Sequence, residues 1–229
     1  LRPNADVPNK LRETSYCSNP GGMSMNEAAT IPEAFLTAYD SLWLQCGVHK
    51  DHRVLIHAIG SGVGLAARQL CQAVDIEVWG STRNAMKVDS IGKNTFQMID
   101  GSIPDHVPEM DIVLDCVGAT YFPENIRILR DKGQLQVIGL MGGVKTTLPL
   151  HKVLKKRLTI RGTTLRNRSI PERTLLNRSF KEEILPLFAS RVLVPMVDSV
   201  FDWHDVERAH ARMQLNQNQG KIVLQVKSD

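Results

Sequence analysis

A glycine-rich turn lies between an apolar run and an amphipathic segment of this chain, and it limits the folds that the chain can adopt. The run covers residues 54–58, and the turn that follows contains Gly60, Ser61, Gly62, Val63 and Gly64. After the turn, apolar side chains recur at helical spacing, at Val63, Ala66, Ala67, Leu70, Cys71 and Val74. This order of strand, tight turn and helix is typical of a dinucleotide-binding unit, in which backbone amides and the helix dipole hold a pyrophosphate. The alternative is a purely structural turn, because Leu65 interrupts the Gly-x-Gly-x-x-Gly pattern at its last position.

Short apolar runs alternate with helical patterns along most of the remaining chain. After the first run, strands are predicted at residues 77–80, 97–99, 112–115, 135–139 and 158–162. The runs are apolar on both faces and are separated by helices, which predicts a parallel sheet covered on both sides. We therefore predict an α/β fold, with a Rossmann-type doubly wound parallel sheet of about six strands.

The two ends of the chain have a different character. A helix is predicted to begin at Ser24, which has Glu27 at capping-box spacing. Beyond the sheet, helices are predicted near Pro171 and after Asp202, and the strand predicted over residues 221–226 has no partner in the main sheet. The predicted organisation is an irregular tail or linker over 1–22, a Rossmann domain with its leading helix over 23–168, and a C-terminal remnant of a second domain over 169–229.

The residues that follow the second predicted strand favour one coenzyme over another. An NAD site usually places an acidic residue there, which binds the ribose 2′-hydroxyl. This chain instead has Ser81, Thr82 and Arg83, and hydroxyls with a guanidinium suit a 2′-phosphate that a carboxylate would repel. Glu77, the acidic residue close by, is placed at the start of the strand. The sequence therefore favours NADPH over NADH.

Two later strand ends are expected to line the same coenzyme, because ligands of open parallel sheets bind outside the carboxyl ends of the strands. Cys116 and Gly118 follow the fourth predicted strand, and Gly139 closes the fifth. The glycines would let the coenzyme lie against the backbone. No histidine is placed to activate Cys116, so we interpret it as a small buried residue rather than a nucleophile. No catalytic residue is assigned.

Composition argues against several other functions. Lys and Arg total 28 against 24 acidic residues, and a net charge of +4 does not indicate nucleic acid as the main partner. The four cysteines form no C-x-x-C pair and the seven histidines show no metal-ligand spacing, which predicts no metal site. The G-x-S-x-G motif of hydrolases is missing. The apolar runs are too short for a membrane span and no signal peptide is evident, so we expect a cytoplasmic protein.

Several segments together resemble the medium-chain dehydrogenase/reductase superfamily, and within it the zinc-free quinone oxidoreductase branch. The resemblance covers about residues 23–226 and rests on the segments 27–39, 57–64, 114–118, 139–143, 164–168, 184–186 and 220–224. It implies NADPH-dependent transfer of hydride, without zinc, from the nicotinamide to a quinone or a related conjugated carbonyl. It also implies a homodimer formed through the edge strand at 158–162.

The same resemblance assigns binding roles by position. It places Thr37 near the nicotinamide ribose, the turn from Ser61 to Gly64 at the pyrophosphate, and the segment from Ser81 to Arg83 at the adenosine phosphate. The residues it places around the nicotinamide are Leu140, Met141, Thr164 and Asn218.

Three departures from the family pattern bear on activity. Members of the family begin with a β-rich, GroES-like lobe that forms the other wall of the active-site cleft, and residues 1–22 cannot supply it. Gly101 replaces a tyrosine that is common near the adenine phosphate, and the segment after Arg83 is shorter than in the family. The leading hypothesis is therefore a reductase whose turnover is impaired by the missing lobe. Two alternatives stay open: a non-catalytic NADPH-binding redox sensor or interaction protein, and a reductase of enoyl or enone substrates.

Overall fold

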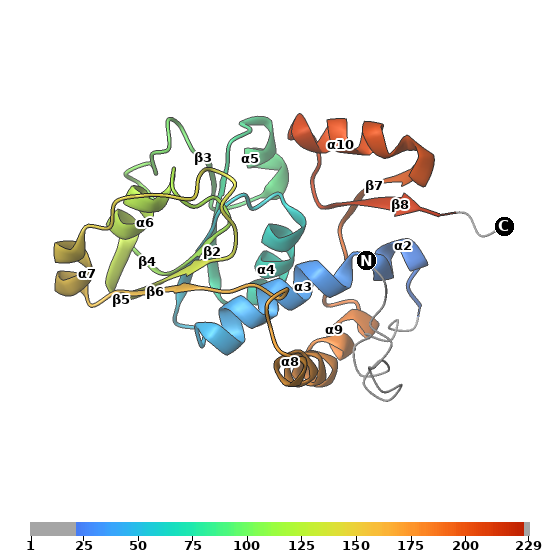
Figure 1. Cartoon of the computed structure of the whole chain (residues 1–229), viewed down its shortest axis with the longest axis horizontal. Helices are drawn as coiled ribbons and strands as arrows, with labels where there is room; N and C mark the ends of the chain where they lie inside the picture. Colours follow the sequence, from blue (N-terminus) through green and yellow to red (C-terminus); the bar gives the residue numbers. More distant parts are fainter. Residues whose placement is uncertain (1–21, 227–229) are drawn as a thin grey trace.

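The computed structural model describes residues 22–226, and its centre is one six-stranded sheet (Figure 1). The strands are β1 (Arg53–Ile56), β2 (Glu77–Thr82), β3 (Thr95–Gln97), β4 (Met110–Asp115), β5 (Leu129–Val137) and β6 (Thr159–Gly162). They lie in the order β3-β2-β1-β4-β5-β6, and every neighbouring pair is parallel. The strand order reverses between β1 and β4, which is the switch point where doubly wound sheets bind ligands. The predicted fold class is confirmed.

Two strand boundaries differ from the sequence prediction. β3 lies at Thr95–Gln97 rather than at 97–99, because its backbone pairs with the second half of β2 over these residues. β5 begins at Leu129 rather than at Leu135, because Leu129 pairs with the start of β4 across a shift in register. Three charged residues at 130–132 hide this early start from a search for apolar runs.

Helices cover both faces of the sheet, and alternate residues of the central strand enter two separate cores. Val54 and Ile56 of β1 enter a core shared with α3 and α4, whereas Leu55 enters the opposite core, which α6 covers. All three side chains are at most 1% exposed. Burial of apolar surface contributes roughly 25 cal/mol per Å², so this two-sided burial is the main source of the sheet's stability. The helices around the sheet are α3 (Ile31–Tyr39), α4 (Gly62–Gln72), α5 (Met86–Ile91), α6 (Phe122–Ile128) and α7 (Leu150–Lys156).

The segment that leads into the sheet forms three consecutive helical parts. α2 (Met25–Ala29) begins at Ser24, whose hydroxyl and the Glu27 carboxylate form the predicted capping box. α3 follows, with Pro32 in its first turn, where a missing N–H is tolerated. α3 then continues directly into a π-helix, η1 (Asp40–Gln45).

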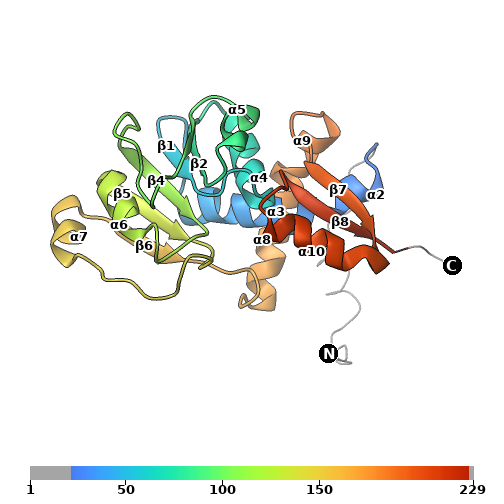
Figure 2. The same cartoon turned by 90° about the horizontal axis from the view of Figure 1, so that it is seen from above.

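The C-terminal part first completes the core and then forms a second, smaller sheet. Phe180 of α8 (Ile170–Glu183) and Phe188 of α9 (Leu185–Ala189) are buried in the same core as α3. The chain continues through β7 (Val197–Asp202), η2 (Trp203–Asp205), α10 (Val206–Gln214) and β8 (Lys221–Gln225). β7 and β8 pair in parallel with each other and not with the main sheet. They lie with α10 at the end of the molecule opposite β5, β6 and α7 (Figure 2).

The expectations for this C-terminal region are confirmed in part. The final strand exists and stands outside the main sheet, as predicted, but its partner β7 was not predicted. The Asp202 side chain accepts a hydrogen bond from the His204 amide at 3.1 Å, so it caps the short helix η2, which α10 follows. Apart from Gly22, the predicted tail over 1–22 lies outside the described residues. Among residues 22–226, no helix has both the length and the apolar character needed to cross a membrane.

Candidate functional site

The glycine-rich bend directly follows β1 at the carboxyl edge of the sheet. The Ile59 amide donates to the Ser81 carbonyl at 3.0 Å, which ties the bend to β2. The Ser61 hydroxyl accepts a hydrogen bond from the Gly64 amide at 3.0 Å and caps the first turn of α4. The bend therefore presents the positive end of an 11-residue helix at the switch point of the sheet.

Gly64 is the glycine of the bend whose missing side chain matters most for packing. A Cβ at this position would lie 2.6 Å from the Ile59 carbonyl oxygen and 2.7 Å from that of Ala58. No ordinary side chain tolerates such contacts with backbone atoms. Gly64 therefore allows α4 to begin directly against the bend.

The C-terminal segment covers part of the bend, which the sequence reasoning did not foresee. The Gly220 amide donates to the Gly60 carbonyl at 3.0 Å, and Gly220 forms an isolated parallel bridge with Ser61. The aliphatic chain of Lys221 lies against Gly62, where an added Cβ would be 2.7 Å from the lysine Cδ, and its ammonium pairs with Glu33. Lys221 therefore brings a positive charge beside the bend. The only sequence signal for it was the motif at 220–224 on which the family resemblance rests.

The three residues expected at the adenosine phosphate differ in exposure. Ser81 and Thr82 are 1% and 5% exposed, because β2 continues through both residues and keeps them inside the sheet. The Ser81 hydroxyl lies 2.6 Å from His57 Nδ1, and the Thr82 hydroxyl accepts the Asn84 amide at 3.2 Å. Arg83, the first residue after the strand, is exposed. The Ser81 side chain is thus directed into the protein, and the role of Ser81 at a phosphate stays a prediction.

The loops after β4 and β5 lie against each other. The Gly142 amide donates to the Val117 carbonyl at 2.7 Å, and the Ala119 amide donates to the Gly143 carbonyl at 3.1 Å. Gly118 has a φ of 84°, and a Cβ there would lie 2.9 Å from the Gly143 oxygen. Close backbone contact between the two loops therefore requires glycine at position 118.

The other candidate residues on these loops behave in two ways. A Cβ at Gly139 would lie 2.8 Å from the Cys116 carbonyl oxygen, so this glycine also allows a close approach of the two loops. Burial raises the pKa of the Cys116 thiol to about 12, so the thiol stays protonated and is a poor nucleophile. Leu140 and Met141 are 52% and 70% exposed. They leave an apolar surface beyond the strand ends.

The remaining candidate residues lie on three different elements. Thr37 is half-buried on α3, and Thr164 is exposed in the segment that follows β6. Asn218 is half-buried, and its carbonyl oxygen accepts a hydrogen bond from the Lys87 ammonium at 2.6 Å. The same ammonium donates to Asn216 Oδ1 at 3.0 Å. Asn218 therefore lies beside α5, and Lys87, only 7% exposed, is a second cation that the sequence reasoning missed.

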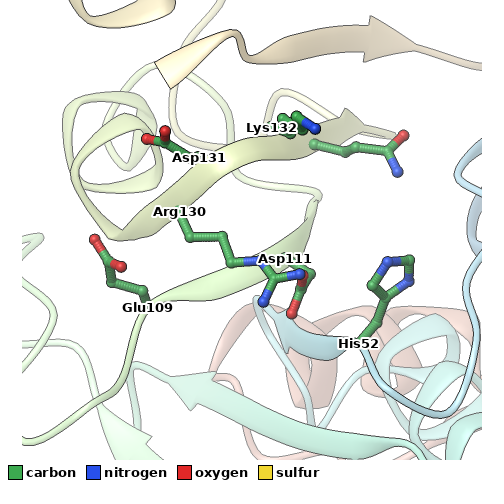
Figure 3. A pocket seen from close by; sticks show the side chains of 7 residues that line it. His52, Glu109, Asp111, Arg130, Asp131 and Lys132 are labelled. Carbon is green, nitrogen blue, oxygen red and sulfur yellow. The ribbon is translucent and has the colours of Figure 1, made fainter. Parts of the chain in front are cut away.

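A large hollow lies at the other edge of the sheet (Figure 3). It measures about 540 Å³ and is lined mainly by charged side chains near the starts of β1, β4 and β5. Arg130 and Asp111 inside it form an ion pair, and Asp111 also accepts the Arg53 amide at 2.8 Å. Parallel sheets bind ligands at the carboxyl edge, so the bend is a better candidate for a ligand site than this hollow. Within residues 22–226, no three histidine, cysteine or acidic side chains are grouped as a metal site requires.

Comparisons with known proteins agree with this geometry. The family described as zinc-binding dehydrogenase matches residues 93–224. The chain is 30% identical to the synaptic vesicle membrane protein VAT-1 homolog of Danio rerio over 90% of its own length and 47% of that protein. It is 25% identical to the quinone oxidoreductase-like protein 2 of Bos taurus, covering 91% of this chain and 62% of that protein. It thus spans about half the length of the curated relatives that it matches.

A solved structure gives the same picture. A crystal structure described as an NAD-dependent alcohol dehydrogenase superposes with a TM-score of 0.80 at 28% sequence identity. The superposition covers 92% of this chain and 62% of the other.

Proposed function

The chain belongs to the zinc-binding dehydrogenase family of medium-chain dehydrogenases/reductases, and we propose that it binds NADPH at the carboxyl edge of its sheet for hydride transfer. The observation that carries this proposal is the β1–bend–α4 unit at the switch point of the sheet, capped by Ser61 and closed by Gly64. Bound NADPH would supply the hydride. The protein would hold and orient the coenzyme and exclude water from it.

The pyrophosphate would lie at the start of α4, held by backbone amides of the segment 60–64. The amides of Ser61 and Gly64 are excepted, because they donate to the Ala58 carbonyl at 2.8 Å and to the Ser61 hydroxyl at 3.0 Å. The helix dipole and Lys221 both favour an anion there. The present partner of Lys221, Glu33, is 73% exposed, so its ion pair contributes little and can be exchanged for a phosphate.

The adenosine 2′-phosphate would be bound by Arg83. Residues 80–84, at the end of β2, include no acidic residue that could bind a free ribose 2′-hydroxyl. Glu77 lies at the opposite end of the strand, where its carboxylate accepts a hydrogen bond from Trp79 Nε1 at 2.8 Å. The alcohol dehydrogenase in the comparison is named for NAD, so that likeness does not favour NADPH. The preference for NADPH that we propose rests on Arg83.

At the nicotinamide end, the two loops after β4 and β5 would form the binding surface. Gly118 and Gly139 allow the two loops to pack closely against each other. Leu140 and Met141 would offer apolar contacts to the nicotinamide. Thr37 on α3 and Thr164 after β6 would offer hydroxyl groups. The acceptor that we propose is a quinone or a related conjugated carbonyl, in keeping with the name of the bovine relative. The hydride would pass directly from the coenzyme to the acceptor, and the reduction would also consume one proton. We name no donor for this proton, so we assign no catalytic residue.

A titration with both reduced coenzymes tests the proposal. Coenzyme fluorescence would be followed for the wild type, for Arg83→Ala and for the charge-matched control Lys50→Ala, which alters an exposed cation near the opposite edge of the sheet. Loss of a charge-assisted hydrogen bond should weaken NADPH by about 1–3 kcal/mol in Arg83→Ala and leave NADH unchanged. Equal affinities of the wild type for NADPH and NADH would remove the phosphate assignment, and failure to bind either would remove the proposed function.

A homodimer through the outer edge of β6 belongs to the same proposal. Within the described residues, β6 pairs only with β5, so its other edge is free, and Ile160 on it is 37% exposed. A free, partly apolar edge is a template for pairing with a second chain. Sedimentation should show a dimer for the wild type and a monomer for Ile160→Lys.

A further inference from the structure

Four fully buried polar side chains form a chain of hydrogen bonds directly behind the bend. His57 at the end of β1 lies between Ser81 of β2 and Asn125 of α6, at 2.6 Å from each. Asn125 Nδ2 donates to Asp115 at the end of β4 at 2.9 Å. All four residues are at most 1% exposed. Buried polar groups are costly unless satisfied, and here each one finds its partner on a different element.

The donor and acceptor groups of these four side chains allow only one direction for the series of hydrogen bonds. Asp115 accepts from the Val117 and Gly118 amides at 2.6 and 3.1 Å, so it acts as an acceptor toward Asn125 as well. Asn125 must then present its amide nitrogen to Asp115 and its oxygen to His57. His57 Nε2 therefore carries the proton, and Nδ1 is left as an acceptor. The Ser81 hydroxyl is consequently the donor at the last hydrogen bond of this series, to His57 Nδ1.

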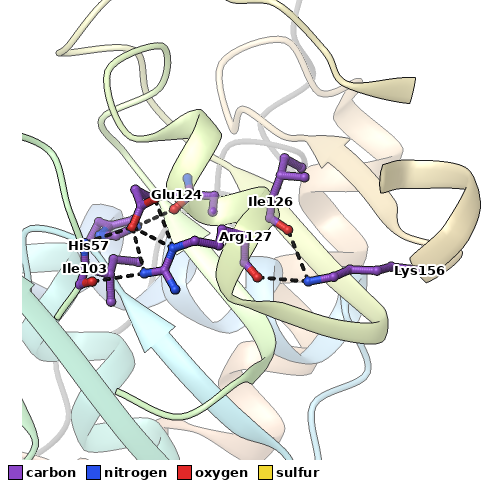
Figure 4. A network of polar contacts seen from close by, with 7 residues as sticks. His57, Ile103, Glu124, Ile126, Arg127 and Lys156 are labelled. Atoms are coloured by element: carbon purple, nitrogen blue, oxygen red, sulfur yellow. Dashed lines mark hydrogen bonds and ion pairs between the residues drawn. The ribbon is translucent and has the colours of Figure 1, made fainter. Parts of the chain in front are cut away.

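The helix that carries Asn125 is itself fixed from outside (Figure 4). Glu124 accepts the Ile103 amide at 3.0 Å and pairs with Arg127, which in turn donates to the Ile103 carbonyl at 2.9 Å. Lys156 donates to the Arg127 carbonyl at 2.8 Å, near the last turn of α6. Asn125 is thus held toward His57 by contacts on both sides of it in sequence.

We infer that His57 is a positioning residue of the coenzyme site, a role that rests on the proposed function. Its neutral imidazole connects the end of β2 to the ends of β1 and β4, so it sets the position of the bend relative to the loop 116–118. Burial lowers the pKa of His57, which agrees with a neutral ring. The bend holds the pyrophosphate and the loop faces the nicotinamide, so their relative position affects any dinucleotide.

The same series of hydrogen bonds leaves the Ser81 hydroxyl with no donor for a phosphate. Its one hydroxyl proton is donated to His57, and a phosphate accepts hydrogen bonds but does not donate them at neutral pH. Ser81 therefore acts on coenzyme binding only through His57. Arg83, two residues later, is left as the side chain that distinguishes NADPH from NADH.

Paired affinities separate these two roles. Ser81→Ala should weaken NADPH and NADH by the same factor, about tenfold, because it leaves His57 Nδ1 buried without a donor. Ser81→Cys, which keeps a weak donor of similar size, should restore part of both affinities. Arg83→Ala should weaken NADPH alone. A selective loss of NADPH affinity in Ser81→Ala, or wild-type affinities for both coenzymes, would overturn the inference.

A spectroscopic measurement on the wild type tests the inference even if the Ser81 variants fail to fold. The ¹⁵N shifts of His57 should show a protonated Nε2 and an unprotonated Nδ1, in both the free and the coenzyme-bound protein. The opposite tautomer, or an imidazolium at neutral pH, contradicts the direction of the chain and overturns the inference. If the wild type binds neither coenzyme, the proposed function fails together with this role, whereas a wrong tautomer in a protein that binds NADPH removes this role alone.

Discussion

The six-stranded sheet and the small β7–β8 unit are held together by different forces. Every residue of β4 is buried, whereas β8 buries only Val223 and leaves Leu224 41% exposed. The sheet is therefore stabilised by apolar burial on two faces. The strands of the small unit bury little apolar surface, and an isolated pair of strands is only marginally stable in water.

Polar contacts supply what the small unit lacks in apolar burial. Asp198 of β7 binds Arg212 of α10 at 2.6 Å and accepts the Gln219 amide at 2.8 Å. Lys87 of α5 holds the segment 216–218, and Gly220 pairs with the bend. The small unit is thus attached to the sheet at the proposed coenzyme site. The sheet therefore folds around its own core, whereas the small unit depends on contacts at the site it covers.

Truncation of a core side chain should show the largest contrast between the two regions. Leu55→Ala removes a fully buried side chain from β1 and should lower the free energy of unfolding by about 2–5 kcal/mol. The matched change Leu224→Ala in β8 should cost less than about 1 kcal/mol, since that side chain is already partly in water. Urea denaturation measures both. Equal losses would mean that the small unit has a core comparable to that of the sheet.

A methyl group at the bend should have the next largest effect, because the two regions meet there. Gly64→Ala places a Cβ against the Ile59 carbonyl and should destabilise by about 1–3 kcal/mol through overpacking. It should also weaken coenzyme binding, since α4 must shift away from the bend. Gly162→Ala is the control, because the nearest atom to its new Cβ is 3.8 Å away. Unchanged stability and affinity in Gly64→Ala would show that the backbone of the bend can move away from the added methyl group at little cost.

The same contrast explains what the sequence allowed us to predict. Apolar periodicity marked β1, β2, β4 and α4, and small residues marked the bend, because local pattern and tertiary burial agree in these elements. β7 reads Val-Asp-Ser-Val-Phe-Asp, and its residues are half-buried except Val200, which is exposed, so no pattern of apolar residues distinguishes it from a loop. Strands held by long-range polar contacts leave little local signal.

The candidate site divides in the same way. The bend and the loops after β4 and β5 were found at the sheet edge where the order of strands and helices predicted them. The inward direction of Ser81 was missed, because it depends on His57, which lies 24 residues away, and on Asn125, which lies 68 residues from His57. The positions of Lys87 and Lys221 were missed for a similar reason, since each acts on a distant segment.

Removal of the lysine contact between the two regions should have an intermediate effect. Lys87→Met keeps the aliphatic chain but removes the hydrogen bonds to Asn216 and Asn218, and should cost about 1–2 kcal/mol. The loss should be local, with faster hydrogen exchange in β8 and little change in β1. Lys93→Met, at an exposed position, is the control. Faster exchange throughout the sheet would contradict the view that the small unit can open separately.

The smallest expected effect concerns the charge inside the small unit. Burial alone would raise the pKa of Asp198, but hydrogen bonds from Arg212, Gln219 and Ser199 outweigh it and lower the pKa to about 2. Between about pH 4 and pH 2 the unfolded chain therefore binds a proton that the folded protein does not, so stability falls as pH falls through this range. Because Arg212 is 36% exposed, we expect this contribution to be only about 1 kcal/mol.

Asp198→Asn separates this contribution from those of the other carboxylates. The variant should lose about 1 kcal/mol at neutral pH and should show a shallower decline in β8 protection between about pH 4 and pH 2 than the wild type. The exposed Asp75→Asn should follow the wild-type curve. If Asp198→Asn declines as steeply as the wild type, the carboxylate is not what holds the small unit together. Its attachment would then rest on Lys87 and on the backbone bridge at Gly220, which do not titrate in that range.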